Sequence, residues 1–378
     1  MKRKIAIIGG SYLQLPLVQK AQEMGLEVHC FAWEEGAVCK DVADFFYPIS
    51  IVEKALILDK CREIGINGIT SIASDLAVLT VNYVAGQMGL VGNDDQYSFV
   101  QTNKYLMRQC FDRNGLPSPR FYLVQGEGAL PTFEKWHWPL IVKPTDRSGS
   151  RAVCRVTDKN QLVRAVHDAM DASFAKEAIV EEFVTGKEVS VEAISWKGKH
   201  FILQITDKVT TDEHFVEIAH HQPSLLPERV QKRIRAVVEN ALTALHIENG
   251  ASHSELKITS SGDLKIMEIG ARMGGGFIGS HLVPLSTGYD YMRGVIEIAL
   301  GSFTEPVLNS GAYSGIFFLV EDTAYLAEII KHPEYYPDIV IAERTSDSIL
   351  PAISESDRTG YLIYKSNHRI DDIRYDRL

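Results

Sequence analysis

Two glutamates, Glu255 and Glu268, lie on the arms of a predicted hairpin in HSELKITSSGDLKIMEIGARMGGG, residues 253–276. A two-residue turn at Ser261-Gly262 would set them directly opposite each other, with both side chains on one face. Like charges in this position destabilise an antiparallel pair. A divalent cation would remove the repulsion, because Mg²⁺ is usually held by one or two carboxylates together with substrate phosphates. The alternative is a solvated strand face with coincidental acids.

The two faces of this predicted hairpin differ in character. The acidic face carries His253, Glu255, Lys257, Ile266, Glu268 and Gly270, and the opposite face carries Leu256, Ile258, Met267 and Ile269. A slip of one residue in the register would move one glutamate into the core. We therefore expect one face to be anchored and the other to display both carboxylates.

A lysine and a loop of glycine and serine residues follow another predicted strand. Lys143 ends the apolar run LIV and directly precedes the loop 144–153. Gly149 frees the backbone there, and Ser148 and Ser150 add hydroxyl and amide groups that can surround phosphate oxygens. The alternative is a surface loop with a lysine nearby.

Two further segments suggest a nucleotide. Lys104 opens a predicted helix, 104–114, where a positive charge is electrostatically unfavourable, so we expect an anionic partner from outside. The segment EEFV, residues 181–184, can offer a backbone carbonyl and amide to a purine edge, while Glu188 can accept ribose hydroxyls. The alternative for this segment is a strand, a turn and a strand with surface acids.

The elements that must position these groups indicate an α/β protein. The first 100 residues alternate strand and helix, which predicts an open parallel sheet. Gly9-Gly10 lacks the full G-x-G-x-x-G spacing, so packing explains it better than a dinucleotide. A hairpin turning at Lys197-Gly198 and a helix over 227–245 precede the acidic hairpin. Two further predicted strands, GAYSGIFFLV and GYLIYKS, follow Gly301.

Composition limits the possible functions. The chain has 378 residues, 45% hydrophobic and 23% charged, which predicts two or three globular units. The net charge of −10 argues against broad nucleic-acid binding. Five scattered cysteines suit a reducing compartment. The five-residue apolar run near the N-terminus is too short for a signal or a membrane span. We expect a soluble, cytoplasmic protein.

The order of these features resembles the ATP-grasp superfamily from about residue 1 to residue 300. It consists of Lys104, Lys143, the serine-glycine loop, EEFVTGKE, then the paired glutamates with Arg272 four residues after the second. The sequence is most similar to the carboxylate–amine (amino-acid) ligase branch, related to biotin carboxylase and the carbamoyl phosphate synthetase large subunit. The resemblance implies an N-terminal open parallel α/β (pre-ATP-grasp) domain, a two-lobed α+β ATP-grasp fold and a small C-terminal closing unit. Their expected bounds are 1–100, 101–300 with a lid lobe at about 120–187, and 301–378.

The resemblance also assigns ATP-binding roles. Lys104 and Lys143 would hold the phosphates beneath a lid loop, 146–153, which includes Ser148, Gly149 and Ser150. The adenine slot would be lined by Glu181, Glu182, Phe183 and Val184, with the Glu182 carbonyl and the Val184 amide on the base. Glu188 would bind the ribose.

Metal and substrate roles follow in the same way. Glu255 and Glu268 would bind two Mg²⁺ ions, or Mn²⁺, and Arg272 would act with Lys143 in catalysis by clamping a substrate carboxylate or its acyl phosphate. The substrate residues implied are Lys208, Gly275 and Gly276. Many relatives have E-x-N-P-R where this chain has EIGAR, so Gly270 replaces an asparagine that helps to bind the second metal.

The implied reaction is carboxylate activation: ATP phosphorylates an acid, and an amine attacks the acyl phosphate to give an amide, ADP and phosphate. The expected partners are a small carboxylic acid and an amine, with neither nucleic acid nor membrane, in a homodimer. One alternative is a carboxyphosphate-forming carboxylase of the purine-pathway type. Another is a non-catalytic nucleotide-binding subunit. His214, His220 and His221 either border the substrate site or lie in a surface loop.

Overall fold

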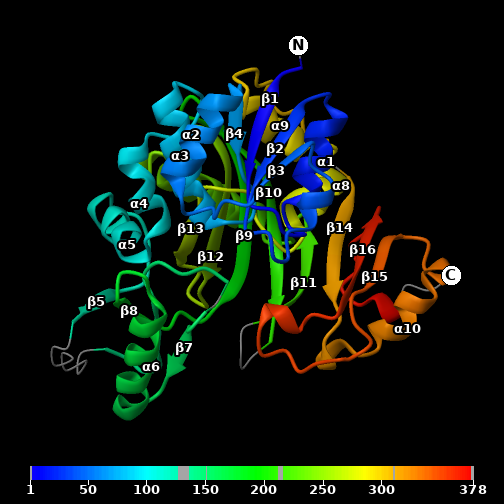
Figure 1. The fold of residues 1–378 in the computed structure, drawn as a ribbon. Coiled ribbons are helices and arrows are strands. Elements are labelled where there is room, and N and C mark those ends of the chain that lie inside the picture. Colours follow the sequence, from blue (N-terminus) through cyan, green and yellow to red (C-terminus); the bar gives the residue numbers. More distant parts are fainter. Residues whose placement is uncertain (1, 127–135, 150, 212–215, 310, 376–378) are drawn as a thin grey trace.

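The computed structural model describes residues 2–126, 136–149, 151–211, 216–309 and 311–375, and these residues form three β-sheets (Figure 1). An N-terminal sheet lies at the top of that view, a small sheet at lower left, and a large sheet runs through the centre. The fold is the predicted mixed α/β class. Among the described residues, no helix has the length and apolar character needed to cross a bilayer.

The N-terminal sheet is parallel, as predicted, with the strand order β3-β2-β1-β4. Its strands are β1 (Lys4–Ile8), β2 (Glu27–Phe31), β3 (Phe45–Tyr47) and β4 (Gly68–Thr70). Its helices are α1 (Leu15–Glu23), α2 (Lys54–Ile64) and α3 (Asp75–Met88), followed by α4 (Ser98–Thr102) and α5 (Lys104–Arg113). A Cβ atom on Gly10 would lie 2.9 Å from the Cβ of Ala32, so close packing explains that glycine.

The small sheet is antiparallel and forms a separate lobe with the strand order β5-β8-β6-β7. Its elements are β5 (Phe121–Gln125), β6 (Leu140–Pro144), β7 (Cys154–Val156), α6 (Lys159–Ala172) and β8 (Glu177–Glu182). Helix α6 buries Leu162 and Val166 against Val142 and Val180 of the sheet. This lobe carries Lys143 at the end of β6 and the EEFV segment at the end of β8.

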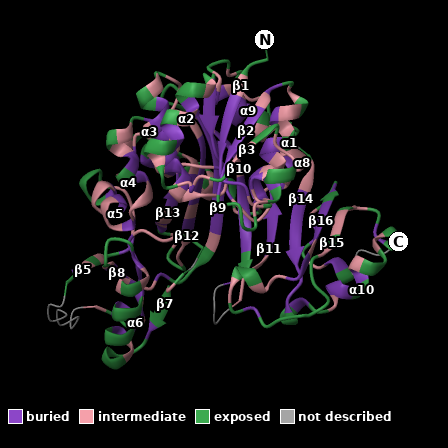
Figure 2. Ribbon diagram, viewed as in Figure 1, coloured by how far each residue is buried: buried purple, intermediate pink, exposed green. Residues whose placement is uncertain are grey.

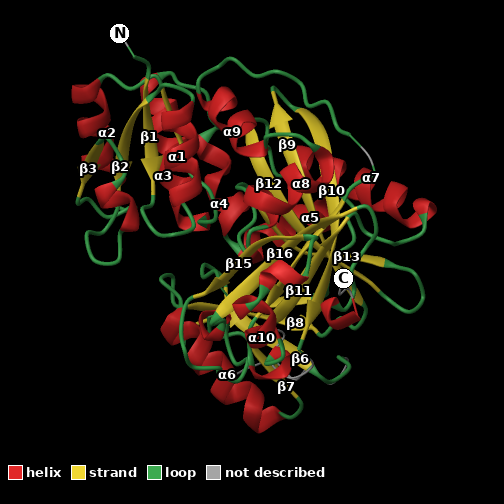
Figure 3. Cartoon of the chain, turned by 90° about the vertical axis from the view of Figure 1, so that its right-hand side faces the viewer, coloured by secondary structure: helices red, strands yellow, loops and turns green. Residues whose placement is uncertain are grey.

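The central sheet is antiparallel, with the strand order β13-β12-β9-β10-β11-β14-β16-β15. Its strands are β9 (Lys187–Trp196), β10 (Lys199–Thr210), β11 (Glu217–Gln222), β12 (Gly250–Ile258), β13 (Leu264–Gly270), β14 (Tyr313–Phe318), β15 (Ile339–Arg344) and β16 (Gly360–Ser366). The associated helices are α7 (Glu228–Ala244), α8 (Val283–Thr287), α9 (Tyr291–Ala299) and α10 (Leu326–Lys331). Because β11 pairs with β14, the three C-terminal strands extend the sheet that carries the acidic hairpin (Figure 3).

The two faces of the central sheet serve different purposes. On β9, Val189 and Val191 join a core that includes Ile234 and Val238 of α7. The intervening Glu188, Ser190 and Glu192 point to the other face, because successive side chains of a strand alternate. Figure 2 shows the middle strands buried along most of their length, so this polar face is also covered. It forms the floor of the candidate site.

The acidic hairpin confirms the predicted pairing of Glu255 with Glu268. Its loop differs from the prediction: the turn is not the two-residue Ser261-Gly262 but the three-residue loop 260–262. The amide of Gly262 donates to the carbonyl of Thr259 at 2.9 Å, and Gly262 has φ +84°, the arrangement typical of a three-residue hairpin loop.

A bulge at Met267 accounts for the remaining difference in the hairpin. Glu255 pairs with Glu268, but the next residue, Leu256, pairs with Ile266, so Met267 is left unpaired. Ile266 is therefore fully buried in the core rather than on the acidic face, and Met267, predicted to be a core residue, is half-buried. The change in loop length and the bulge offset each other, which is why the two glutamates still meet.

Candidate active site

The two opposing glutamates each contact a lysine from a different element. Lys208 of β10 places its Nζ 2.7 Å from Glu255 Oε1, and Lys104, the first residue of α5, places its Nζ 2.8 Å from Glu268 Oε1. Lys104 also donates to the carbonyl oxygen of Arg147 at 2.7 Å. The cation at the start of the helix therefore has protein partners, in addition to any ligand. The repulsion expected between the glutamates is relieved by these two ammonium groups.

Burial and charge act in opposite directions on these groups. Burial disfavours the charged form of Lys104, but the carboxylate of Glu268 outweighs this and raises the pKa of Lys104. Burial likewise opposes ionisation of Glu255, yet the ammonium of Lys208 and the imidazole of His253 lower the pKa of Glu255. Lys104 and Glu255 are therefore charged at neutral pH.

Lys208 lies at the centre of an acidic cluster formed by Glu188, Glu217 and Glu255. Its Nζ lies 3.0 Å, 2.5 Å and 2.7 Å from oxygens of these three residues in that order. The three carboxylates each offer an oxygen within 4.8 Å of the others. Burial lowers the pKa of Lys208, but the three carboxylates together raise it well above its usual value. The three carboxylates surround the ammonium of Lys208, and hard oxygen ligands of this kind also suit a divalent ion such as Mg²⁺.

A second buried group of ion pairs joins the lobe of the small sheet to helix α5. Glu181 of β8 has a side chain 1% exposed, and its two oxygens contact Arg108 Nε and Lys143 Nζ, each at 2.7 Å. Arg108 Nη2 also donates to the carbonyl of Met267 at 2.5 Å. Met267 is the residue that the bulge leaves unpaired in the hairpin. Burial lowers the pKa of Lys143, and Glu181 offsets only part of the effect. The carboxylate of Glu181 thus faces Lys143 and Arg108.

The predicted lid loop and adenine segment lie in the same lobe. Ser148 and Gly149 are exposed, Gly149 has φ +69°, and Ser150 lies outside the described residues. Phe183 lies beneath two cations, with Arg155 4.7 Å and Lys257 5.6 Å from its ring centroid. Two other residues predicted to line the adenine slot are Glu182 and Val184. The Glu182 carboxylate lies 3.4 Å from Lys265, and Val184 is buried.

Arg272 is held by an acid that the sequence did not suggest. Its Nε and Nη2 donate to the two oxygens of Asp75 at 2.9 Å and 3.1 Å. Asp75 begins helix α3 of the N-terminal unit, 197 residues away. Burial opposes ionisation of Asp75, but the guanidinium of Arg272 lowers its pKa. Such bidentate pairs fix the plane of the guanidinium.

This ion pair explains the glycine that replaces asparagine at position 270. A Cβ atom on Gly270 would lie 2.8 Å from Asp75 Oδ1 and 3.1 Å from Arg272 Cζ. An asparagine there would therefore push against the ion pair. The departure from E-x-N-P-R follows from how closely Asp75 approaches β13.

The glycine-rich segment after Arg272 borders the acidic cluster. A Cβ atom on Gly276 would lie 3.3 Å from His220 Nε2, whereas one on Gly275 would meet no neighbouring atom within 4 Å. His220 Nε2 in turn lies 3.3 Å from Glu217 Oε2. Gly276, predicted with Gly275 as a substrate edge, thus lies beside His220, which in turn contacts Glu217.

The segment around His220 is a strand, which corrects the surface-loop alternative. Residues 217–222 form β11, between β10 and β14, and His220 and His221 are 0% and 1% exposed. His214 lies outside the described residues. The prediction failed here because a strand buried on both faces does not show polar and apolar alternation. His220 borders the candidate site, while His221 faces the C-terminal core and bonds Tyr364 Oη at 3.0 Å.

His221 gives the fold a predictable sensitivity to acid. Burial, followed by the charge of Arg369, lowers the pKa of His221 from 6.5 to about 3. Below pH 6.5 the unfolded chain binds a proton that the folded chain does not, so the free energy of unfolding falls by about 1.4 kcal/mol per pH unit. We expect a loss of about 2 kcal/mol between pH 6.5 and about pH 5, measured by urea unfolding.

The matched variants are His221→Gln, which should flatten this pH dependence, and His167→Gln, which alters an exposed histidine of α6 and should leave it unchanged. An equally steep dependence in His221→Gln would contradict the assignment.

The C-terminal unit reaches the acidic cluster through one arginine. Arg358 Nη2 lies 3.1 Å from Glu217 Oε2, and Nε donates to the carbonyl of Glu217 at 3.1 Å. Its guanidinium lies 4.1 Å from the ring centroid of Phe318 on β14. Residues from the last quarter of the chain therefore help to hold a carboxylate of the site.

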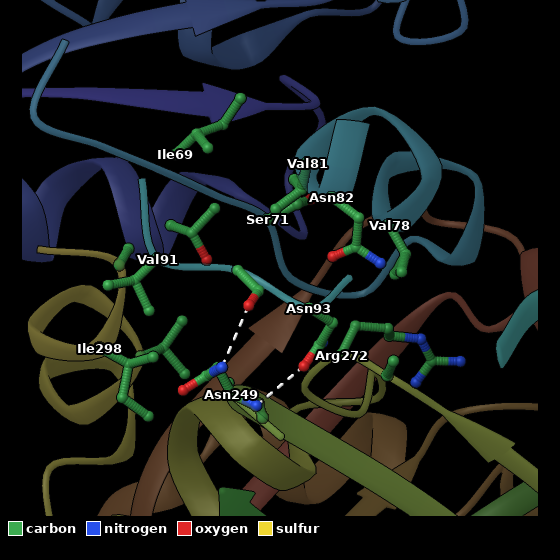
Figure 4. A pocket seen from close by; sticks show the side chains of 17 residues that line it. Ile69, Ser71, Val78, Val81, Asn82, Val91, Asn93, Asn249, Arg272 and Ile298 are labelled. Atoms are coloured by element: carbon green, nitrogen blue, oxygen red, sulfur yellow. Dashed lines mark hydrogen bonds between the residues drawn. The ribbon is translucent and has the colours of Figure 1, made fainter. Parts of the chain in front are cut away.

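A small cavity lies between the N-terminal unit and the central sheet (Figure 4). It measures about 50 Å³, and its lining includes Asn93, Asn249 and Arg272. Asn249 Nδ2 donates to the carbonyl of Gly92 at 3.0 Å, and the Asn249 amide donates to Asn93 Oδ1 at 2.8 Å. Ligand pockets usually measure several hundred Å³, so this cavity suits water rather than a nucleotide.

Sequence reasoning missed several residues of the site, all of which act through tertiary contacts. They are Asp75, Arg108, Glu192, Glu217 and Arg358. Two of them had a usable signal. Arg108 lies four residues after Lys104 on one helix face, and the pattern E-V-S-V-E on β9 alternates as a strand with one polar face should.

Comparisons with known proteins show what this chain is similar to. Residues 136–281 match the ATP-grasp domain model. Alanine–anticapsin ligase of Bacillus subtilis (strain 168) is 24% identical over 355 residues, covering 84% of this chain and 73% of that protein. An L-amino acid ligase from Bacillus licheniformis has a similar structure, with a TM-score of 0.82, 23% identity, and coverage of 97% and 94%. PurK, an N5-carboxyaminoimidazole ribonucleotide synthetase, gives a TM-score of 0.77, 16% identity, and coverage of 97% and 93%.

Proposed function

We propose that this chain is an ATP-dependent ligase that forms C–N bonds and belongs to the carboxylate–amine ligase branch of the ATP-grasp superfamily, as its similarity to the ATP-grasp domain model and to related ligases suggests. The proposal rests above all on one observation: the opposing Glu255 and Glu268 each contact a lysine from a separate element. Two acids and two cations so arranged can hold a metal ion and the phosphates that it carries.

The lid lobe and helix α5 supply the nucleotide site. Lys104 and Lys143 bind the ATP phosphates, and the loop 146–153, with Ser148, Gly149 and Ser150, covers them. The segment Glu181–Val184 lines the adenine slot through its backbone, because the Glu181 side chain is already bound by Arg108 and Lys143. Glu188 binds the ribose and shares Lys208 with the acidic cluster.

The hairpin supplies the metal site. Glu255 and Glu268 fit Mg²⁺, or Mn²⁺, since they are paired across the hairpin and both present hard carboxylate oxygens. Bound metal would offset the charge of the triphosphate and favour phosphoryl transfer. Lys208 would then turn from the acidic cluster toward the transferred phosphate.

Arg272 and the glycine-rich segment supply the acyl site. A substrate carboxylate oxygen attacks the γ-phosphorus of ATP, the bond to the bridging oxygen breaks, and ADP leaves. Arg272, oriented by Asp75, holds the carboxylate and the acyl phosphate it becomes. A neutral amine then attacks the acyl carbon, phosphate leaves, and the amine nitrogen gives up a proton to phosphate or solvent as the amide forms. This sequence needs no nucleophile from the protein.

The substrates are proposed to be amino acids, as the name of the related alanine–anticapsin ligase suggests. Gly275 and Gly276 would form the backbone edge of the acceptor pocket, beside His220 and Glu217. Glu217 offers a carboxylate to a substrate ammonium group.

We further propose a cytoplasmic homodimer organised in units at about 1–100, 101–300 and 301–378. A monomer in sedimentation at micromolar concentration would contradict the dimer.

A matrix of amino acids and small acids tests the proposal. Phosphate release from Mg·ATP should require an acid and an amine together, and the product should have the mass of their amide. Phosphate release that requires bicarbonate without an organic acid would instead support a carboxyphosphate-forming enzyme. Tight ADP binding without turnover for any pair would support a non-catalytic subunit.

A further inference from the structure

A buried acid next to the proposed metal site has no part in the steps described above. Glu192 of β9 is 0% exposed and lies directly opposite His253 of β12. One of its oxygens, Oε1, forms a short hydrogen bond with His253 Nδ1, and the other, Oε2, accepts from the amide of Gly274 at 3.3 Å. Burying a carboxylate costs free energy unless the group has hydrogen-bonding or charged partners. His253 and Gly274 are these partners, so they are the residues that Glu192 positions.

His253 carries the contact onward to a proposed metal ligand. Its second ring nitrogen, Nε2, lies 3.4 Å from Glu255 Oε1. The two ring nitrogens of His253 therefore face two different carboxylates, Nδ1 that of Glu192 and Nε2 that of Glu255. The ring bridges the two acids and fixes where they lie relative to each other.

The glycine-rich segment packs directly on this pair. A Cβ atom on Gly274 would lie 2.6 Å from His253 Nδ1 and 3.1 Å from Glu192 Oε1. Any side chain at that position would displace the ring or the carboxylate. Gly274 follows Arg272 by two residues, so the pair contacts the strand that holds Glu255 and also the segment that begins with the catalytic arginine.

We propose that Glu192 and His253 are positioning residues, which hold Glu255 in place for the metal and couple it to the glycine-rich acceptor edge. This inference rests on the proposed function. Replacing a residue that hydrogen-bonds to a metal ligand typically changes the metal affinity by about 10-fold to 100-fold. Through Gly274, the same pair should affect how the acceptor amine binds.

Two substitutions of His253 separate its two hydrogen bonds. In His253→Asn the side-chain amide can replace Nδ1 and keep the bond to Glu192, while the bond to Glu255 is lost. In His253→Gln the longer amide can replace Nε2 and keep the bond to Glu255. We expect His253→Asn to weaken Mn²⁺ binding in the presence of ADP by about tenfold, and His253→Gln to stay within about threefold of wild type.

The binding readout involves no turnover: the electron paramagnetic resonance signal of free Mn²⁺ is followed during titration of the full chain with ADP present. Steady-state kinetics should show that Glu192→Gln raises the KM for the amine more than it lowers kcat. The matched control is His200→Asn, since both ring nitrogens of His200 are also bonded, to Ser195 and Thr243, outside this site.

Wild-type Mn²⁺ affinity in a folded His253→Asn protein would overturn the proposal. If that variant does not fold, an unchanged amine KM in Glu192→Gln would overturn it instead. Failure of wild-type protein to bind Mn²⁺ with ADP would reject the proposed function itself, so the two failures can be distinguished.

Discussion

Replacing Glu268 with glutamine is expected to lower kcat by about 10³-fold, equivalent to about 4 kcal/mol of transition-state stabilisation. Glutamine keeps the size of the side chain but removes the charge that faces Glu255 and neutralises Lys104. A metal held by only one carboxylate of the hairpin would bind more weakly. It would also be less well positioned to neutralise the charge of the triphosphate. The apparent Mg²⁺ constant should rise together with the fall in kcat, both measured from ADP formation with the best substrate pair.

The control for this substitution is Glu239→Gln, which alters an exposed glutamate of helix α7 and should leave kcat unchanged. Thermal melting of metal-free protein should show that Glu268→Gln is folded. Full product formation by a folded Glu268→Gln preparation would show that Glu268 is not a metal ligand.

Replacing Arg108 with methionine is expected to lower the free energy of unfolding by about 3 to 5 kcal/mol. The guanidinium is 1% exposed and binds both Glu181 and the carbonyl of Met267. Methionine fills much of the space but leaves the buried carboxylate with Lys143 as its remaining partner among the contacts described. The substitution also removes the hydrogen bond from Arg108 to the carbonyl of Met267 in the bulge. Glu268 and Lys143 should then both be less rigidly held, and the KM for ATP should rise.

Urea unfolding measures the effect, with Arg113→Met as the control, because Arg113 is an exposed residue of the same helix. The double variant Arg108→Met with Glu181→Gln should be no more stable than Arg108→Met, because the second substitution removes the carboxylate that pairs with the buried ammonium of Lys143. A free energy of unfolding within about 1 kcal/mol of wild type for Arg108→Met would contradict the role given to this group of ion pairs.

Local patterns predicted much of the fold because they are set by nearby residues. The helix predicted at 104–114 is α5, Lys104–Arg113, and the turn at Lys197-Gly198 lies where its sequence places it. The pairing of Glu255 with Glu268 was also predicted, although for an incomplete reason. The loop and the bulge each shift the register by one residue, and only their combination preserves the pair.

Contacts between distant segments could not be predicted in this way. Asp75 reaches Arg272 across 197 residues, and neither sequence contains a signal for the other. Arg358 approaches Glu217 because β11 and β14 share one sheet, a pairing that periodicity does not specify. The lysine and glutamate motifs therefore predicted the chemistry, while the acids and arginines that orient them became visible only in the folded chain.

The central claim is that the γ-phosphoryl group of ATP is transferred to the substrate carboxylate before the amide forms. Substrate acid labelled with ¹⁸O in its carboxylate tests this directly. The released phosphate, analysed by mass spectrometry, should contain one ¹⁸O atom for each amide formed, because the oxygen that attacks phosphorus leaves with it. Amide formation accompanied by unlabelled phosphate would contradict the account.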